Sequence, residues 1–439
     1  MDRRRFTSTL VASALLGSLP RPLWGDPAAR LARIDGARLN RRLLALREFG
    51  GTDSGGTHRL GYSEADKAAR VAVTQWMREA GLTPRVDEAG NLIGSRVGTA
   101  RDLPPLLFGS HIDSVPDGGN YDGNLGTIAA IDVAQALQEQ GRTLRHPIEV
   151  CVWANEEGGL YGSRAVSGQF AAHELALTTT SGKTVEDGIR FLGGDPARLD
   201  RAVRRRGDIA GYFELHIEQG GVLEGTNTAV GVVEGIVGIK WWDVTITGMA
   251  NHAGTTPMDQ RRDAMLAAGR FIDLVNRVVR ATPGSQVGTV GRLRALPGAP
   301  NVIPGTVVCS LELRDLSDAK IDALYTAITR EATAIAEATG TSFAYQALHI
   351  NEAAPSDPLM RSVIADAAGA LGVSARVMPS GAGHDAQAIA QLGPMGMIFI
   401  PSVGGISHSP KEYSTPEHCA LGGDILLHAV LAADATLSR

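Results

Sequence analysis

Strands and helices alternate along most of this chain, and this alternation limits its possible folds more than any other feature. A buried-type strand at 106–108 is followed by helical apolar spacing at 127–140. Further short strands follow at 148–153, 211–216 and 397–400. Strands that alternate with helices favour a mostly parallel sheet covered by helices on both faces. The expected fold class is therefore α/β.

The pattern changes between about residues 238 and 351. The elements expected there are a strand at 240–247, a helix at 261–280, strands at 286–294 and 306–314, a helix at 318–339 and a strand at 342–350. This βαββαβ order is the ferredoxin-like arrangement. We therefore expect one complete module, residues 238–351, inserted into an outer α/β domain made of residues 33–237 and 352–439.

The N-terminus has the pattern of an export signal. Three arginines and Phe6 precede a mostly apolar stretch from Leu10 to Leu19. About ten residues suit a signal sequence and are too few to span a bilayer. The paired arginines resemble a bacterial twin-arginine signal. We therefore expect a signal over 1–25 and a periplasmic or secreted protein, or a cytoplasmic one if this segment is only a basic tail.

Composition excludes some classes of partner. The chain has 439 residues, of which 44% are hydrophobic, and its formal net charge is -5. This charge gives no electrostatic support for a nucleic acid or an anionic membrane as partner. After the signal, no segment is expected to span a membrane. The three cysteines, Cys151, Cys309 and Cys419, form no CxxC pair, and their spacing does not argue for a disulfide. Cys151 and Cys309 lie in apolar strand patterns and are expected to be buried thiols.

Side chains of the metal-ligand type follow four strands of the outer domain: His111, Glu157, His216 and His408. The carboxyl ends of strands in an open α/β sheet form its ligand crevice, so these side chains should converge. Asp122, in the glycine-rich loop after His111, completes the set. Nitrogen and carboxylate ligands suit Zn²⁺, or alternatively Mn²⁺, Co²⁺ or Ni²⁺. With one bridging carboxylate, five ligands make two three-ligand sites.

Glu156 and Glu157 are adjacent, and two such carboxylates repel each other unless a cation separates their roles. The hypothesis is that one binds a metal while the other handles the proton of the attacking water. The alternative is a solvated acidic turn. Asp113, two residues after His111, is placed to accept the ring N–H of that histidine and to orient it.

Six motifs together resemble the M20 metallopeptidase superfamily. They are Gly109–Ser114, Tyr121–Gly123, Asn155–Gly158, His216–Gly220, His252–Met258 and Gly405–Pro410. More narrowly, they resemble its amidohydrolase branch: N-carbamoyl-L-amino-acid hydrolases, β-ureidopropionases and allantoate amidohydrolases. His216, in place of a carboxylate, separates this branch from the aminoacylases and carboxypeptidases. The resemblance covers nearly all of the chain after the signal. It implies a zinc-exopeptidase-like catalytic domain and an inserted dimerisation and substrate-lid domain.

The resemblance also implies roles for the site residues. Asp122 would bridge two divalent metals, with His111 and His216 completing one site. Glu157 and His408 would complete the other. Glu156 would be the general base that deprotonates the attacking water and then protonates the leaving nitrogen. His252 would stabilise the oxyanion in the active site of a partner subunit, which implies a homodimer.

For the substrate, the resemblance implies that Asn301 and Arg314 hold its carboxylate. A planar guanidinium suits that bidentate task. Gln219 would contact the carbamoyl or ureido group, and Gly383 with His384 would line the pocket. From the residues alone, Arg314 could equally pair with an acidic neighbour, and Asn301 could be a turn residue.

The first expectation is therefore a dinuclear amidohydrolase that cleaves the carbamoyl C–N bond of small carboxylates, N-carbamoyl-L-amino acids above all. The second is an allantoate or related ureide amidohydrolase, which would share every metal ligand. A dipeptidase or deacylase is third, because His216 disfavours it. A non-catalytic binding protein on the same fold would have lost a ligand or Glu156, and neither is lost.

Overall fold

This computed structural model describes residues 32–437, so the expected signal at 1–25 lies outside the described residues. A nine-stranded sheet has the order β1-β2-β4-β3-β5-β16-β6-β14, with β15 paired to β6. Its strands are β1 (Thr83–Val86), β2 (Leu92–Arg96), β3 (Leu106–His111), β4 (Ile148–Trp153), β5 (Gly211–Ile217), β6 (Val230–Ile236), β14 (Ala354–Pro355), β15 (Ala375–Ser380) and β16 (Met395–Ile400). The strand β6 was not anticipated from the sequence pattern.

The centre of this sheet is parallel. Strands β4, β3, β5 and β16 pair in parallel, whereas β1 and β2 on one side and β6 and β14 on the other join by antiparallel pairing. All residues of β3, β5 and β16 are buried. Strands buried on both faces are the mark of a parallel sheet between helical layers. The expected α/β fold class is confirmed.

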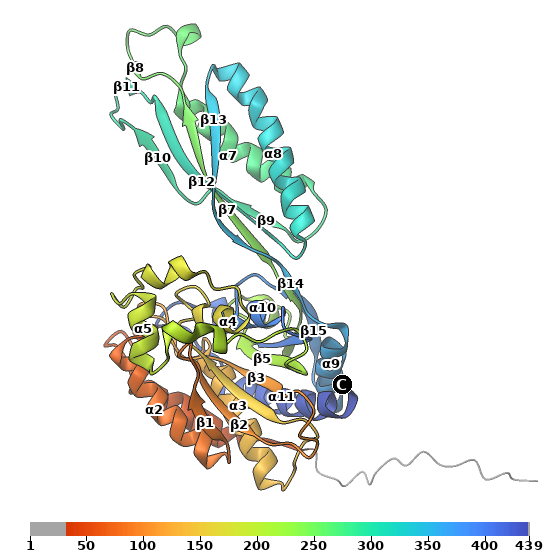
Figure 1. Cartoon of the computed structure of the whole chain (residues 1–439). Helices are drawn as coiled ribbons and strands as arrows, with labels where there is room; N and C mark the ends of the chain where they lie inside the picture. Colours follow the sequence, from red (N-terminus) through yellow and green to blue (C-terminus); the bar gives the residue numbers. More distant parts are fainter. Residues whose placement is uncertain (1–31, 438–439) are drawn as a thin grey trace, which may run out of the picture. The chain divides into compact units, whose positions relative to one another are not determined.

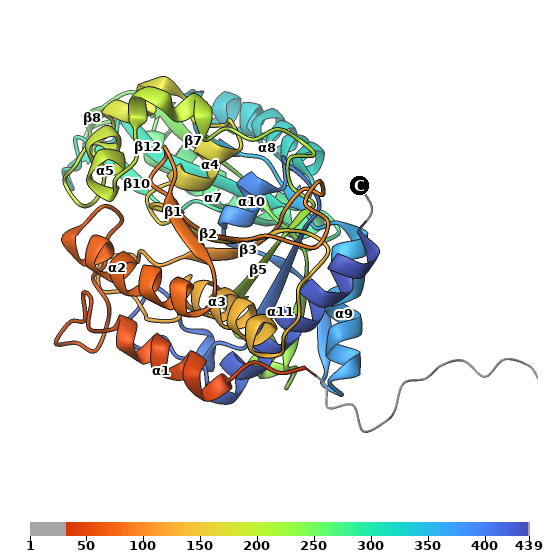
Figure 2. The same ribbon diagram turned by 60° about the horizontal axis from the view of Figure 1, so that its bottom comes forward.

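Helices cover both faces of this sheet (Figure 2). Helices α1, α3 and α11 pack on one face, and α4 and α10 lie against the other. The bounds are α1 (Gly36–Leu46), α2 (Glu64–Glu79), α3 (Asn124–Glu139), α4 (Tyr161–Val166), α5 (Val185–Leu192), α6 (Val222–Gly225), α9 (Pro358–Ala370), α10 (Asp385–Ile389) and α11 (Pro416–Thr436). Short 3₁₀ turns lie at Ala172–Ala176, Pro196–Arg201 and Val403–Gly405.

A second, antiparallel sheet lies in the segment expected to be inserted (Figure 1). Its order is β10-β12-β7-β13, with β9 also paired to β12. The elements are β7 (Gly238–Thr247), β8 (Asn251–His252), the 3₁₀ turn Met258–Gln260, α7 (Ala264–Ala281), β9 (Val287–Thr289), β10 (Leu293–Leu296), β11 (Val302–Ile303), β12 (Thr306–Asp315), α8 (Asp318–Thr339) and β13 (Ser342–Asn351). Their order along the chain follows the expected βαββαβ arrangement.

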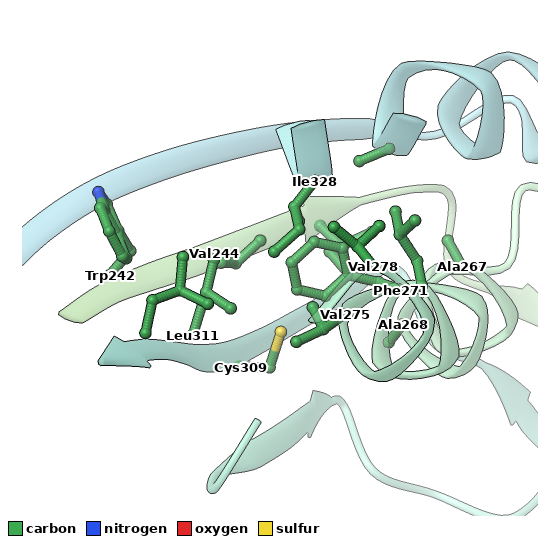
Figure 3. Packing of buried hydrophobic residues seen from close by; sticks show 14 of the residues in the cluster. Trp242, Val244, Ala267, Ala268, Phe271, Val275, Val278, Cys309, Leu311 and Ile328 are labelled. Atoms are coloured by element: carbon green, nitrogen blue, oxygen red, sulfur yellow. The ribbon is translucent and has the colours of Figure 1, made fainter. Parts of the chain in front are cut away.

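One face of the second sheet is covered by α7 and α8. Alternate residues of β7, such as Trp242 and Val244, pack with Phe271 of α7 and Ile328 of α8 (Figure 3). This alternation leaves Trp241 and the other residues of odd number in β7 on the face without helices. The described residues from Arg33 onward form one compact unit. The division at 238 and 351 therefore stays a prediction.

The single strand expected at 286–294 is wrong, because two strands form there. Thr289 of β9 pairs with Glu312, and Leu293 of β10 pairs with Cys309. The three residues 290–292, between β9 and β10, thus lie opposite two residues of β12, which interrupts the pairing as a bulge does. The Ser310 hydroxyl accepts the N–H of Arg292, at 3.1 Å, and so satisfies a donor that leaves the ladder.

The cysteines and helix α11 bear on two further expectations. All three cysteines are free and buried, which was expected for Cys151 and Cys309. Among the described residues, α11 is long and apolar enough to cross a membrane, but 61% of its apolar window is buried inside the protein. It packs against α1, α3, α9 and β16 and serves as a core helix.

Candidate metal centre

The five expected ligands lie at the carboxyl edge of the parallel strands. His111 is the last residue of β3, and His216 is the penultimate residue of β5. Glu157 follows β4 after a short turn, and Asp122 lies just before α3. His408 comes eight residues after β16, beyond the turn at Val403–Gly405. Neighbouring parallel strands thus bring together residues that lie far apart in sequence.

The Asp122 carboxylate lies at the centre of the cluster. Its Oδ1 atom is 3.5 Å from Nε2 of His111 and 3.1 Å from Nε2 of His216. Its Oδ2 atom is 3.3 Å from Nε2 of His408, which is 3.7 Å from Oε2 of Glu157. Two groups of possible metal ligands therefore share this one carboxylate: His111, Asp122 and His216, and Asp122, Glu157 and His408.

The hydrogen bonds of two histidines leave Nε2 free to bind a metal. Nδ1 of His111 lies 3.0 Å from the backbone oxygen of Asp113, and Nδ1 of His216 lies 2.9 Å from that of Ile217. A carbonyl only accepts, so each Nδ1 carries the proton and each Nε2 keeps its lone pair. The backbone N–H of Gly123 donates to Nε2 of His216, at 3.2 Å, in agreement with this tautomer.

Asp113 orients His111 as expected, but through a different atom. Its backbone carbonyl accepts the ring N–H, whereas its carboxylate lies 3.7 Å from that nitrogen. The carboxylate instead accepts the backbone N–H groups of Glu156 and Glu157, at 3.2 and 3.1 Å. Because the turn after β4 leaves these two donors without partners in the sheet, the buried Asp113 satisfies them and holds both glutamates in place.

Close packing and backbone strain also define the site. Gly123 has φ +64°, and a Cβ atom there would lie 2.4 Å from the His111 ring. Asn155, Gln219 and His408 have φ values of 53°, 58° and 52°, in the left-handed region that residues other than glycine rarely adopt. Such strain persists only where the surroundings enforce it, and it gathers at functional sites.

Burial and charge shift the pKa values of the ligands in opposite directions. Burial by itself raises the pKa of Asp122, but the three histidines around its carboxylate outweigh burial and hold this pKa well below its ordinary value. Burial, helped by the Asp122 charge, raises the pKa of Glu157 to about 8. The hydrogen bond to Asp122 raises the pKa of His408 to about 9. The cluster therefore holds protons that a bound cation would displace.

The adjacent glutamates have different surroundings. Only Glu157 belongs to a ligand group, and its buried Oε1 has no hydrogen-bond partner. Oε2 of Glu156 lies 3.8 Å from Nε2 of His111. Burial raises the pKa of Glu156 well above its ordinary value, and the nearby His111 opposes this shift. An unpartnered buried carboxylate oxygen among imidazole nitrogens fits a divalent cation, so the donor set suits the expected metals.

A cavity of about 690 Å³ opens beside this cluster. Its walls include four of the five expected ligands, all but His111, and they also include Glu156. Four of the expected substrate-binding residues line the same cavity: Gln219, Arg314, Gly383 and His384. Nε2 of Gln219 donates to Oδ2 of Asp122, at 2.7 Å. The structure therefore places these four residues next to the possible metal ligands.

Arg314 also makes the pairing that was the alternative to a substrate role. Its Nε donates to Oε1 of Glu312, at 2.7 Å, and its Nη1 donates to the backbone oxygen of Gly381, at 2.6 Å. The two contacts hold the guanidinium at the cavity wall. His384 is buried, and its Nε2 lies 2.8 Å from the Ser380 hydroxyl. Burial and the nearby His216 hold the pKa of His384 well below its ordinary value, so its ring is neutral.

His252 and Asn301 do not line this cavity. Both are exposed, and they lie together where β8 pairs with β11. The backbone N–H of Ala253 donates to the Asn301 carbonyl, at 3.0 Å, and Asn301 lies in a turn. Nδ1 of His252 accepts the N–H groups of Gly254 and Thr255. This arrangement puts the ring proton on the exposed Nε2, where it can be donated.

The comparison with protein families agrees with this geometry. The model of peptidase family M20/M25/M40 matches residues 107–432, which include all five possible ligands. The chain belongs to this family. M20 proteins depend on metals, and the shared-carboxylate cluster is where this member can hold them.

Relatives of this M20 protein include enzymes that act on ureido compounds. The N-carbamoyl-L-amino acid amidohydrolase of Geobacillus stearothermophilus is 42% identical over 402 residues, which cover 90% of this chain and 98% of that protein. The allantoate deiminase of Arabidopsis thaliana is 34% identical, with 87% and 80% covered. A solved amidase of the hydantoinase/carbamoylase family from Burkholderia multivorans is 36% identical, with a TM-score of 0.85 and coverage of 93% and 100%.

The sequence analysis of this M20 chain missed one buried carboxylate. Oε1 of Glu412 accepts the N–H groups of Tyr121 and Asp122, at 2.9 and 3.0 Å, and its Oε2 accepts the hydroxyl of Ser407, at 2.7 Å. Glu412 therefore ties the loop of Asp122 to the loop of His408. The available signal was weak, since a lone acidic residue after a Ser-Pro-Lys run is usually solvated.

Proposed function

We propose that this chain is a dinuclear metal-dependent amidohydrolase that cleaves the carbamoyl C–N bond of N-carbamoyl-L-amino acids. The observation that carries the proposal is the sharing of Asp122 by two three-residue ligand groups beside a cavity with Arg314 in its wall. Relatives named as amidohydrolases of these compounds match nearly their whole length. The family and the site thus support the same chemistry.

The reaction adds water across the ureido bond. The bond between the carbamoyl carbon and the amino acid nitrogen breaks, the amino acid leaves as an amine, and carbamic acid then yields ammonia and CO₂. Glu156 takes a proton from the attacking water and delivers it to the leaving nitrogen. Its place in the cavity wall, at the entrance to the ligand cluster, supports this role.

Metal ions act here through the five ligands already described. Two divalent ions, which we propose to be Zn²⁺, would polarise the substrate carbonyl and promote deprotonation of water near neutral pH. Mn²⁺, Co²⁺ and Ni²⁺ use the same donor types, so metal analysis of the purified protein decides among them. The positive charge would also favour the ionised form of Glu156, which a base requires.

Arg314 has the geometry to bind the substrate carboxylate. Its Nε and Nη1 are held by Glu312 and Gly381, which leaves Nη2 without a hydrogen bond to any described residue. Gln219 reaches from Asp122 towards the same space and can meet the carbamoyl group. Gly383 adds no side chain to the wall, and the neutral His384 beside it closes the pocket.

A homodimer would complete the site. His252 and Asn301 lie together on an exposed turn of the inserted segment, away from the cavity of their own chain. The donor Nε2–H of His252 suits an oxyanion, and the Asn301 amide suits a carboxylate. We propose that both act in the cavity of a second copy, with the inserted segment forming the contact.

We also propose export through the twin-arginine-type signal at 1–25, with a periplasmic or secreted mature protein. The support is the sequence pattern alone. Cell fractionation and N-terminal sequencing of the recovered protein test this proposal, and an intact N-terminus in the cytoplasm would contradict it.

A substrate panel with defined metals tests the activity. The metal-free protein is loaded with Zn²⁺, Mn²⁺, Co²⁺ or Ni²⁺ and is assayed for amino acid release from N-carbamoyl-L-amino acids. Their D-enantiomers and N-acetyl derivatives serve as controls. The expected result is metal-dependent release from the L-carbamoyl compounds. A metal-loaded protein that is inert towards all ureides and amides would indicate a non-catalytic binding protein instead.

Allantoate is the second candidate substrate, because a relative 34% identical is an allantoate deiminase. It carries the same carboxylate and ureido groups, so the ligands and Arg314 do not separate the two. Measurement of ammonia release from allantoate, in the same panel, separates the two substrates. A kcat/KM for allantoate above that for every carbamoyl amino acid would reverse the assignment.

A further inference from the structure

Arg59 is fully buried, yet it forms no ion pair among the described residues. Its side chain instead donates four hydrogen bonds to uncharged acceptors. Nε donates to the Ile112 carbonyl, at 2.6 Å, and Nη2 donates to Oδ1 of Asn124, at 2.8 Å. Nη1 donates to the carbonyls of Leu46 and Phe49, at 2.8 and 2.7 Å. A buried charge without a paired carboxylate is costly and requires an explanation.

Part of the compensation comes from helix α1. Leu46 is the last residue of α1, and Phe49 follows in the next turn. Carbonyls at the C-terminus of a helix carry partial negative charge, which favours a cation there. Burial nevertheless lowers the pKa of Arg59 to about 10. Arg59 is thus anchored to α1 by Nη1, while its other two nitrogens reach elsewhere.

Those two nitrogens reach the segments that bear two of the three ligands in the group of His111, Asp122 and His216. Ile112 directly follows His111, and Asn124 is two residues after Asp122. The backbone of Arg59 adds two more bonds to the first segment, because its N–H donates to the Ser114 hydroxyl and its carbonyl accepts the Ser114 N–H. One residue therefore sets the spacing between the loop after β3 and the start of α3.

The state of Asn124 supports a specific role for its oxygen. Asn124 is 1% exposed, and its Nδ2 has no hydrogen-bond partner within residues 32–437. The side chain thus tolerates an unsatisfied buried donor while its Oδ1 meets Arg59. If Asn124 served only to fill space, an apolar residue at this position would avoid the free-energy cost of the unsatisfied amide donor.

We infer that Arg59 is a positioning residue of the metal centre: its guanidinium holds the His111 and Asp122 segments at the separation that one metal ion requires. This inference rests on the proposed metal centre. Partners that orient ligands typically contribute about 10–100-fold to metal affinity. Arg59 lies in a region outside residues 107–432, so it is not part of the matched family region.

Four variants test the inference in the full chain. Arg59→Lys keeps a charge but has a single nitrogen, which cannot meet all four acceptors. Asn124→Leu removes the acceptor together with the unpartnered amide donor, whereas Asn124→Asp keeps an acceptor of the same shape. Arg42→Met is the matched control, because Arg42 is also buried but, among the described residues, its side chain hydrogen-bonds Asp132, Glu79 and Gln135 and lies over the Trp76 ring, with no contact to the ligand segments. Zn²⁺ affinity is measured by competition with a chelator, and thermal unfolding of the metal-free protein is recorded in parallel.

Zn²⁺ should bind roughly 10–100-fold more weakly to Arg59→Lys and Asn124→Leu than to the wild type. Asn124→Asp should restore the affinity, and Arg42→Met should lower the melting temperature with little change in affinity. Wild-type affinity in a folded Asn124→Leu variant overturns the inference while the metal centre stands. If Arg59→Lys fails to fold, the pair of Asn124 variants decides. A wild-type protein that binds no metal overturns the proposed function itself.

Discussion

Oδ1 of Asp122 lies 3.1 Å from Nε2 of His216, while the other oxygen of the same carboxylate faces His408. One carboxylate therefore belongs to both ligand groups. Asp122→Asn should abolish binding of both ions, because an amide offers only one neutral oxygen to two cations. Loss of the two ions should remove several kcal/mol of transition-state stabilisation, which corresponds to a decrease in kcat of about 10³-fold or more. Elemental analysis after dialysis checks the metal content. His408→Ala serves as the comparison, and it should retain the ion of the His111 group. Two ions in Asp122→Asn would contradict the shared role.

Glu156→Gln should leave both ions bound and lower kcat by about 10²- to 10⁴-fold, the usual contribution of a general acid–base group. The reason is that Glu156 lies in the cavity wall but in neither ligand group. Glu157→Gln is the matched variant, and it should lose metal instead. Steady-state kinetics with elemental analysis separates the two. Near-normal turnover in Glu156→Gln would exclude it as the base.

Mixing two inactive variants should restore activity if His252 acts in a partner subunit. A His252→Ala chain supplies Glu156, and a Glu156→Gln chain supplies His252. Random pairing makes half of the dimers mixed, and one of the two sites in each is complete. Activity should thus reach about a quarter of the wild-type value, on the assumption of a symmetric dimer. Coexpression with two affinity tags isolates the mixed species, which by themselves should reach about half of the wild-type value. If they are as inactive as their parents, His252 does not act across the interface.

Metal binding should release protons and strengthen as the pH rises from 7 to 9. In the metal-free protein the pKa of Glu157 is about 8 and that of His408 is about 9, so both hold protons at pH 7. A cation requires the deprotonated ligands. Both folded-state pKa values exceed their ordinary values of 4.5 and 6.5. The stability that each group contributes to the metal-free protein is therefore complete below its ordinary pKa, 4.5 for Glu157 and 6.5 for His408. It is lost as the pH rises through the folded-state values of about 8 and about 9.

Calorimetry in two buffers of different ionisation enthalpy measures the proton release, and thermal unfolding measures the stability. At pH 7 the release should exceed that at pH 9.5, and the metal-free protein should melt at a lower temperature at pH 9 than at pH 7. His408→Ala should release fewer protons. Equal release at both pH values would show that Glu157 and His408 are already deprotonated without metal.

Much of the fold was predictable because its signals are local. The Ser63 side chain caps α2 by accepting the N–H of Asp66, and Asp357 caps α9 in the same way. The helix expected at 318–339 has these same bounds in α8. The strand β6 was missed, because its run of glycines and valines, Val230–Ile236, shows no clean alternation and forms a strand only between β16 and β15.

The sequence by itself determined which residue types stand after each strand, and hence the expected ligands His111, Asp122, Glu157, His216 and His408. Each ligand lies within a few residues of the end of its own strand, so a local sequence pattern is enough to predict it. Only the tertiary structure decided the rest: which oxygen of Asp122 faces which histidine, that the carbonyl of Asp113 orients His111, and that Glu412 joins two loops. It also brought Arg59 to Asn124. Each of these contacts depends on how the chain folds in three dimensions, and their geometry is set by packing and by the need to satisfy buried polar groups.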